Sequence, residues 1–197
     1  MNEAEILKEF TTAEAILKGH FVLSSGLHSD TYLQCARVFM DPARADRLCS
    51  ALAAKLRQKL PDIQFDLVAS PAMGGVIVGY EMARQLNLPS IFCERENGQF
   101  TFRRGFSIPQ GAKVLLIEDV VTTAKSSLEA IESIKAHGGD VVAEACLVDR
   151  GEGAANLSIP LVSLLKLSVA TYKPDALPDH LKDTPAVKPG SRFLKSA

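Results

Sequence analysis

The chain has 197 residues, of which 47% are hydrophobic and 23% are charged, and its formal net charge is −1. This length and composition predict a folded protein with a substantial core, most simply one domain spanning residues 1–197. A net charge this close to zero offers no electrostatic surface for nucleic acid or an anionic membrane, and we expect neither as a partner. No apolar run reaches membrane-spanning length, and the four cysteines lack metal-site spacing. We therefore expect a soluble, unprocessed, cytoplasmic protein with free thiols.

Residues 1–40 predict short elements rather than a layered core. Apolar residues at helical spacing predict two short helices, the second containing Ile16 and Leu17. Extended segments follow on both sides of the Ser-Ser-Gly turn at residues 24–26. We expect these pieces to form a small N-terminal hood.

Strand and helix signals alternate from residue 41 onward. Asp41-Pro42 predicts an N-cap and a first-turn proline for a helix that ends near Leu60. The predicted strands are 66–70, 90–93, 114–118 and 141–148, and the predicted helices after residue 60 are 75–87 and 126–137. This alternation predicts an α/β fold, with a central, mostly parallel sheet flanked by helices. We expect a core at about residues 41–171 and an irregular C-terminal arm at residues 172–197.

The stretch VLLIEDVVTTAKSS, residues 114–127, carries the strongest chemical signal. Its apolar start predicts a buried parallel strand, and two adjacent carboxylates, Glu118 and Asp119, stand at the carboxyl end of that strand. A hydroxyl-rich turn at residues 122–127 then opens a helix, where backbone N–H groups and the helix dipole favour phosphate. Paired carboxylates accept hydrogen bonds from a vicinal diol. The structural alternative is a carboxylate pair that only caps the next helix.

This stretch resembles the signature of the type I phosphoribosyltransferases, in which apolar residues precede Glu/Asp-Asp, two apolar residues and a Thr/Gly/Ser loop. The resemblance implies the type I fold, and it implies that Glu118 and Asp119 are catalytic and hold the ribose hydroxyls of phosphoribosyl pyrophosphate. It also implies that the following residues bind this substrate, mostly around its 5′-phosphate. These residues are Val120, Val121, Thr122, Thr123, Ala124, Lys125 and Ser126.

The pair Ala124-Lys125 departs from the glycine that the family usually has in this loop. Alanine resists a positive φ, so Ala124 either keeps φ negative or is strained. Lys125 is a candidate for an additional phosphate contact.

A second loop, Ala72-Met73-Gly74-Gly75, ends one predicted strand and opens the next helix. Paired glycines let backbone amides approach an anion closely, although they could equally serve only tight packing of strand against helix. The resemblance implies that this loop binds the pyrophosphate group. It also implies a cis peptide bond between Ala72 and Met73.

Two further stretches resemble the orotate branch of the same family. Residues 19–34, GHFVLSSGLHSDTYLQ, resemble its N-terminal hood, and residues 148–154, VDRGEGA, resemble the strand end whose arginine binds the orotate carboxylate. The resemblance implies that Arg150 selects orotate, because a guanidinium matches a planar carboxylate with two parallel hydrogen bonds. The alternative for Arg150 is a surface ion pair with Asp149 or Glu152. The other orotate contacts that we expect are Ser25, Tyr32 and Thr122.

The polar segment ERENGQFTFRRGF, residues 94–106, resembles a mobile catalytic loop in a short-loop branch of these enzymes. The segment has no clear helix signal, and a long polar insertion inside an α/β domain is usually functional. The lysine and histidine found in the longer loop of other members are not evident, so the loop cations are arginines. The resemblance implies that Arg95, Arg103 and Arg104 bind phosphoribosyl pyrophosphate, with Arg95 catalytic. It also implies a homodimer in which this loop reaches the neighbouring active site.

The resemblance as a whole implies a magnesium-dependent pentosyl transfer from phosphoribosyl pyrophosphate to orotate, giving orotidine 5′-monophosphate in pyrimidine (UMP) biosynthesis. Mg²⁺ is expected to be held mainly by the substrate, with Asp119 as a candidate contact through water and no all-protein cage. Two alternatives stay open. A phosphoribosyltransferase for another nucleobase would not need Arg150. A non-catalytic sensor of the same fold would fit the missing loop lysine and histidine, but we expect no DNA-binding module in the short acidic N-terminus.

Overall fold

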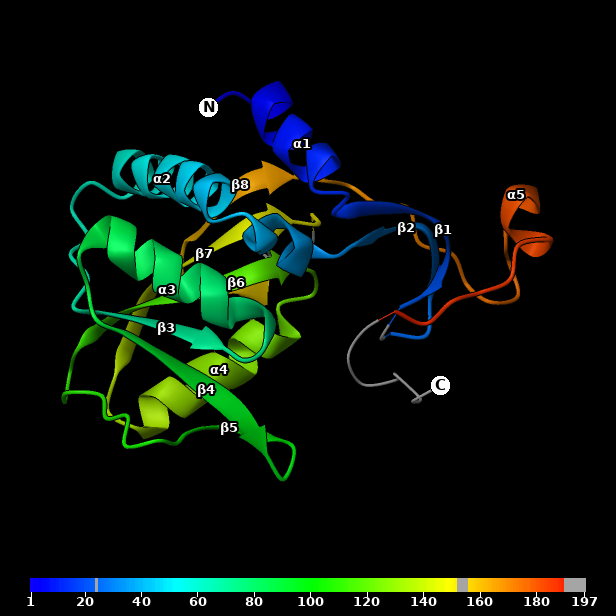
Figure 1. The fold of residues 1–197 in the computed structure, drawn as a ribbon. Helices are drawn as coiled ribbons and strands as arrows, with labels where there is room; N and C mark the ends of the chain where they lie inside the picture. The colour runs from blue at the N-terminus through cyan, green and yellow to red at the C-terminus, as the bar shows by residue number, and fades with distance from the viewer. Residues whose placement is uncertain (24, 152–155, 190–197) are drawn as a thin grey trace.

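The computed structural model describes residues 1–23, 25–151 and 156–189. In this part of the chain six strands form one sheet in the order β5-β4-β3-β6-β7-β8 (Figure 1). All neighbouring strands pair in parallel except β4 and β5, which are antiparallel. The strands are β3 (Leu67–Pro71), β4 (Ser90–Glu96), β5 (Gln99–Phe102), β6 (Lys113–Val121), β7 (Asp140–Asp149) and β8 (Leu161–Lys166). The predicted mostly parallel sheet is confirmed, whereas β5 and β8 have no counterpart among the predicted strands.

Helices cover both faces of this sheet. The helices α2 (Pro42–Lys59) and α3 (Gly74–Leu86) pack on one face, and α4 (Lys125–Ala136) packs on the other. Asp41 caps α2 as predicted, because its side chain accepts a hydrogen bond from the Ala43 N–H at 3.0 Å. The predicted bounds of α3 and α4 differ from the observed ones by a single residue at each end.

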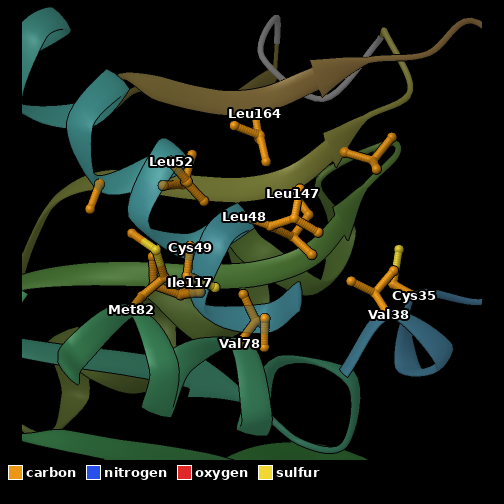
Figure 2. Close-up of a cluster of buried hydrophobic side chains, with 14 of the residues drawn as sticks. Cys35, Val38, Leu48, Cys49, Leu52, Val78, Met82, Ile117, Leu147 and Leu164 are labelled. Atoms are coloured by element: carbon orange, nitrogen blue, oxygen red, sulfur yellow. The ribbon is translucent and has the colours of Figure 1, made fainter. Parts of the chain in front are cut away.

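Two separate hydrophobic cores lie on either side of the central strand β6. Leu115 and Ile117 join the cluster under α2 and α3 (Figure 2), whereas Val114 and Leu116 join the cluster under α4. Successive side chains of a strand point to opposite faces, so a strand that is covered on both faces is apolar throughout. This explains the continuous apolar run in the sequence. The apolar run ends at Ile117, so the carboxylates Glu118 and Asp119 stand near the carboxyl end of β6.

The N-terminal hood differs from the prediction in one element. Helix α1 (Glu3–Thr12) forms, but the second predicted helix is wrong, because Ile16 and Leu17 begin strand β1 (Ile16–Val22). Glu14 takes a left-handed backbone conformation with φ 49°, which ends the helical path. Ile16 then pairs with Leu33 of the antiparallel strand β2 (His28–Leu33). Pairing with β2 therefore overrides the local helical spacing, and a 3₁₀ helix, η1 (Cys35–Met40), connects the hairpin to α2.

The C-terminal arm lies against this hairpin, as Figure 1 shows. The Val22 N–H donates to the Val187 carbonyl at 2.8 Å, and His28 forms an antiparallel bridge with Tyr172. Within the arm, α5 (Asp179–Lys182) is a short helix that the sequence did not predict. The described part of the arm ends at residue 189, so the rest of the predicted arm lies outside the described residues.

The cysteines are all buried free thiols, as expected, at positions Cys35, Cys49, Cys93 and Cys146. Burial is the main cause that raises the pKa of each thiol, which keeps the reactive thiolate form rare. Among the described residues, no helix combines the length and the apolar character needed to cross a lipid bilayer.

Candidate active site

The two carboxylates at the end of β6 point to opposite faces of the sheet. Glu118 is only 7% exposed and hydrogen-bonds with Ser127 in the first turn of α4. Asp119 is partly exposed, and its Oδ1 accepts a hydrogen bond from the Val120 N–H at 2.9 Å. Burial raises the pKa of Asp119, and hydrogen bonds from the backbone oppose this shift.

Asp119 lies directly against the loop that follows β3. A Cβ atom at Gly74 would come within 2.8 Å of both carboxylate oxygens of Asp119. A Cβ atom at Gly75 would instead lie 3.1 Å from the Ile117 carbonyl oxygen and 3.1 Å from Pro71 and Ser70. Close packing therefore accounts for the missing side chain at Gly75, and its contact with pyrophosphate stays a prediction. Gly74 does something further, since it lets the backbone of this loop touch a carboxylate.

The same loop presents its backbone at the carboxyl edge of the sheet. The peptide bond between Ala72 and Met73 is cis, as the family resemblance implied. The Ala72 N–H donates to the Cys93 carbonyl at 2.7 Å, which fixes the loop to β4. Met73 and Gly74 are exposed. Backbone groups of this loop and the Asp119 carboxylate thus share one surface.

The loop between β6 and α4 is open at the helix N-terminus. Ala124 occupies the N-cap position with φ 60°, and among the described residues no side chain caps this end of α4. Of the two conformations considered for Ala124, the structure therefore has the strained one, which costs a non-glycine residue about 1 kcal/mol. The uncapped N–H groups can bind an anion. The exposed side chains around them are Thr122, Thr123, Lys125 and Ser126.

A buried polar cluster beneath Glu118 was not predicted. The Ser127 hydroxyl lies 2.8 Å from Glu144 Oε1 and 3.3 Å from Glu118 Oε1. Burial raises the pKa of Glu118 well above its ordinary value, and the negative charges of Glu144 and Asp119 add to this shift. Burial also raises the pKa of Glu144 to about 7. The signal in the sequence was a single glutamate within the apolar run of β7.

Tyr32 of the hood lies within electrostatic range of Asp119 and Arg150. Burial is the main cause that raises the pKa of Tyr32. The charges of Asp119 and Cys35 raise this pKa further, and the charge of Arg150 lowers it. The Arg150 N–H donates to the Val121 carbonyl at 2.9 Å, so the start of the loop after β7 is tied to the end of β6. The structure thus brings together two of the predicted orotate contacts, Tyr32 from the hood and Arg150, the residue that follows β7.

Two other expectations around this end of the site stay open. Ser25 lies in the exposed turn of the hairpin, where its hydroxyl accepts a hydrogen bond from the Leu27 N–H at 3.4 Å. Its predicted contact with orotate stays a prediction. Glu152, one candidate partner of Arg150, lies outside the described residues, as do residues 153 and 154 of the VDRGEGA stretch.

The segment 94–106 contains a strand pair that the sequence did not lead us to predict. Its first half is an antiparallel hairpin in which β4 pairs with β5 around Asn97-Gly98, both with positive φ. The sequence did contain this signal, because Asn-Gly between strands with alternating apolar residues is typical of a two-residue hairpin turn.

The three arginines of this segment all contact carboxylates. Arg95 hydrogen-bonds with Glu129 of α4, and its guanidinium stacks 4.1 Å from the centre of the Phe100 ring. Arg104 lies 3.0 Å from Glu94, and Arg103 lies 3.4 Å from Glu96. Arg95 is nevertheless close enough to Glu118 for its charge to lower the pKa of that carboxyl. The part of the chain that the structure describes contains no group of three or more His, Cys, Asp or Glu side chains arranged for a metal ion.

The central strand of this mostly parallel sheet ends in a carboxylate pair that lies beside an uncapped helix N-terminus. This arrangement defines an α/β protein whose site suits a phosphorylated sugar. A family model described as phosphoribosyl transferase domain matches residues 41–176. The chain belongs to the phosphoribosyltransferase family and has the type I fold.

Individual relatives agree with this assignment. An orotate phosphoribosyltransferase of Rhizorhabdus wittichii is 57% identical over 197 residues, which are 100% of both chains. The structure of orotate phosphoribosyltransferase from Aeropyrum pernix is similar with a TM-score of 0.69 at 30% identity, over 82% of this chain and 93% of that one. An adenine phosphoribosyltransferase from Saccharomyces cerevisiae has a TM-score of 0.66 at 17% identity, over 82% and 99% of the two chains. That last likeness shows a shared fold alone.

Proposed function

We propose that the chain transfers the 5-phosphoribosyl group from phosphoribosyl pyrophosphate to N1 of orotate, releasing pyrophosphate and forming orotidine 5′-monophosphate in pyrimidine biosynthesis. The carboxylate pair at the end of β6 carries this proposal, because Asp119 touches Gly74 while Glu118 contacts the first turn of α4. One strand end therefore joins the two loops that suit the phosphate groups at either end of the substrate. Full-length relatives with the orotate enzyme's name support the choice of acceptor.

The proposed roles follow from the chemistry of each group. Glu118 and Asp119 accept hydrogen bonds from the ribose 2′- and 3′-hydroxyls and offset positive charge that develops on the sugar ring as pyrophosphate leaves. The uncapped N–H groups of α4 bind the 5′-phosphate, and the Gly74 loop binds pyrophosphate. Orotate N1 loses its proton easily, so catalysis depends on positioning and on charge stabilisation rather than on a strong base.

Arg150 and Tyr32 form the proposed orotate end of the site. A guanidinium selects orotate over neutral nucleobases because only orotate offers a carboxylate for two parallel hydrogen bonds. Tyr32 closes this end from the hood, within electrostatic range of Arg150. A transferase for another base would have no use for this arginine.

The arginines of the β4–β5 hairpin must exchange partners in order to act. Arg95 hydrogen-bonds with Glu129 in the structure, so the proposed contact with pyrophosphate requires Arg95 to leave this carboxylate. A phosphate group with several negative charges is the stronger partner for a guanidinium. If Arg95 exchanges Glu129 for the substrate phosphate, the hairpin moves over the site. The hairpin would therefore close only when the substrate is bound.

Mg²⁺ fits this site as a substrate-bound ion. Asp119 offers a partly exposed oxygen donor at the same edge, and hard oxygen donors suit a cation that keeps most of its waters. We propose that the oxygens of phosphoribosyl pyrophosphate hold the ion and that Asp119 faces one of its waters without being a ligand. When bound, Mg²⁺ neutralises charge on the leaving group.

We also propose that the chain works as a cytoplasmic homodimer, with the hood and arm as parts of a single domain. Helix α3 supports a dimer because its exposed face carries Ile77, 53% exposed, and Tyr80, 67%, and its N-cap residue Met73, 79% exposed, continues this apolar surface. The buried free thiols support a reducing compartment. In the dimer, the hairpin at residues 94–106 would reach the neighbouring active site, and sedimentation of the full chain would test the association.

A turnover experiment tests the proposed activity. The purified chain is incubated with phosphoribosyl pyrophosphate, Mg²⁺ and orotate, and orotidine 5′-monophosphate and pyrophosphate are measured together. Equal amounts of both products support the proposal, and Asp119→Asn should abolish most of the rate. Binding of phosphoribosyl pyrophosphate without any product would favour the sensor alternative instead.

A further inference from the structure

The buried cluster beneath Glu118 contains two carboxylates that share one hydroxyl. Glu144 is 0% exposed and Ser127 is 1% exposed, so neither side chain is open to bulk solvent. The Oε1 atoms of Glu118 and Glu144 both face Ser127 Oγ, at 3.3 and 2.8 Å. A serine hydroxyl has one proton and can donate to only one of them at a time.

If both carboxylates were ionised, two negative charges would face the same oxygen in a buried site. Glu144 Oε2 has no hydrogen-bond partner among the described residues, which makes a full negative charge on Glu144 especially costly. The pair therefore holds one more proton than two ionised carboxylates would. Two carboxyl groups that share a buried site commonly behave in this way.

We propose that Glu118, Ser127 and Glu144 share this proton, and that Glu144 holds it when Glu118 binds the ribose diol. Glu144 is then a positioning residue that acts on Glu118 through Ser127. The inference rests on the proposed function, since it assigns a partner to the residue that receives the sugar.

The proton can move without any group leaving its place. Glu118 Oε1–H donates its proton to Ser127 Oγ, while the Ser127 hydroxyl passes its own proton to Glu144 Oε1. Glu118 is left as an anion that accepts the Ser127 O–H, and Glu144 becomes neutral. The number of protons is unchanged. The remaining oxygen of the ionised Glu118 is then available to accept a hydroxyl of the diol.

The groups around the pair act on the two carboxyls in different senses. Arg95 on β4 favours the ionised form of Glu118, whereas Asp119 on the same strand opposes it. The hydrogen bond from Ser127 on α4 lowers the pKa of Glu144, against the larger effect of burial, and the neighbouring Cys146 on β7 is a neutral thiol. Glu144 is 0% exposed and its Oε2 has no hydrogen-bond partner among the described residues, whereas Glu118 is 7% exposed and gains the sugar hydroxyl as a donor, so Glu144 is the member of the pair better suited to staying neutral when the sugar is bound.

Substitutions at Glu144 and Ser127 test the relay. Glu144→Gln imitates the neutral carboxyl, because its amide N–H can donate to Ser127 Oγ, whereas Glu144→Leu cannot. Ser127→Ala removes the bridge, and Ser133→Ala is the matched control, since Ser133 is also buried on α4 and its hydroxyl has no partner among the described residues. Ribose 5-phosphate is the probe, because it carries the diol and the 5′-phosphate but cannot react.

We expect Ser127→Ala and Glu144→Leu to weaken binding of ribose 5-phosphate about tenfold, the value of one hydrogen bond to a charged group. Glu144→Gln and Ser133→Ala should bind it within about threefold of the unsubstituted protein. In turnover, the weakened variants should show a raised KM for phosphoribosyl pyrophosphate and an unchanged KM for orotate. Equal losses for Glu144→Gln and Glu144→Leu would overturn the proposal.

Infrared spectroscopy of the ligand-free protein gives a readout that does not depend on activity. At neutral pH a protonated carboxyl band should be present in the unsubstituted protein and should weaken or shift in Glu144→Gln, where Glu118 has no second carboxyl to share a proton with. Absence of the band from the unsubstituted protein would contradict the shared proton. Failure of the unsubstituted protein to bind ribose 5-phosphate, with the band present, would instead count against the proposed function.

Discussion

The backbone of Gly74 touches the carboxylate of Asp119 so closely that a Cβ atom on Gly74 would lie 2.8 Å from both of its oxygens. These two residues belong to different loops, one after β3 and one at the end of β6. Adjacent parallel strands bring the loops together at one sheet edge. This contact couples the groups that we assign to pyrophosphate and to ribose.

Gly74→Ala should therefore impair catalysis more than folding. The methyl group must displace the Asp119 carboxylate, and a shift of about 1 Å in a catalytic group can reduce kcat/KM about a hundredfold. Gly111→Ala is the contrasting variant, because Gly111 has φ 75° and open space around its Cβ position. It should lower the free energy of unfolding by about 1 kcal/mol and leave kcat/KM near normal. Steady-state kinetics and urea unfolding of both variants would measure the difference, and a fully active Gly74→Ala would refute this role.

Lys125→Gln should change stability and substrate binding in opposite senses. Lys125 is the first residue of α4, where a positive charge opposes the helix dipole, so its removal should stabilise the ligand-free protein by about 0.5 kcal/mol. The same change should raise the KM for phosphoribosyl pyrophosphate severalfold if the lysine contacts phosphate. Lys135→Gln, in the last turn of the same helix, should destabilise slightly and leave this KM unchanged. An unaltered KM in Lys125→Gln would show that the lysine is only solvated.

The buried Glu144 should make stability depend on pH. Its pKa is about 7 in the folded protein against an ordinary value of 4.5. The folded state therefore binds this proton more tightly than the unfolded state, and the associated stability is present below pH 4.5 and lost as pH rises to about 7. At about 1.4 kcal/mol per pKa unit, the unsubstituted protein should lose about 3 kcal/mol relative to Glu144→Gln across this range. Urea unfolding at several pH values would measure this, and a constant difference between the two proteins would contradict it.

Arg150→Lys should raise the KM for orotate about tenfold, because lysine keeps the charge but loses one of two parallel hydrogen bonds. The KM for phosphoribosyl pyrophosphate should change little. Arg57→Lys is the control. The Arg57 guanidinium donates a hydrogen bond to the Gln85 carbonyl, and so it joins α2 to α3 rather than lying in the candidate site. If both Michaelis constants rise together in Arg150→Lys, the arginine shapes the site as a whole and does not select orotate.

Much of this fold was predictable because its decisive signals are local. The apolar run of β6 is buried on both faces, and Asp41 caps α2 with its own side chain, so each is visible within a few residues. The second hood helix was mispredicted because Ile16 is placed by Leu33, a partner seventeen positions away in the sequence. The β4–β5 hairpin, by contrast, was predictable, because its Asn97-Gly98 turn is a local signal that was present in the sequence and was overlooked.

The candidate site likewise combines residues that a local motif reveals with contacts between segments far apart in the sequence. The Glu118-Asp119 pair and the loop after it form one continuous motif, so their neighbourhood could be predicted. The contact of Ser127 with Glu144 joins α4 to β7, and no spacing in the sequence reveals that the two side chains meet. The pairing of Arg95 with Glu129 likewise depends on how α4 packs beside the end of β4.

Selectivity among nucleobases tests the central claim most directly. Pyrophosphate release from phosphoribosyl pyrophosphate and Mg²⁺ would be measured with orotate, adenine, hypoxanthine and uracil, each in turn, using the full chain. We expect release with orotate and none above background with the other three. Folded protein that is inactive with orotate, or that reacts equally well with adenine, would contradict the assignment.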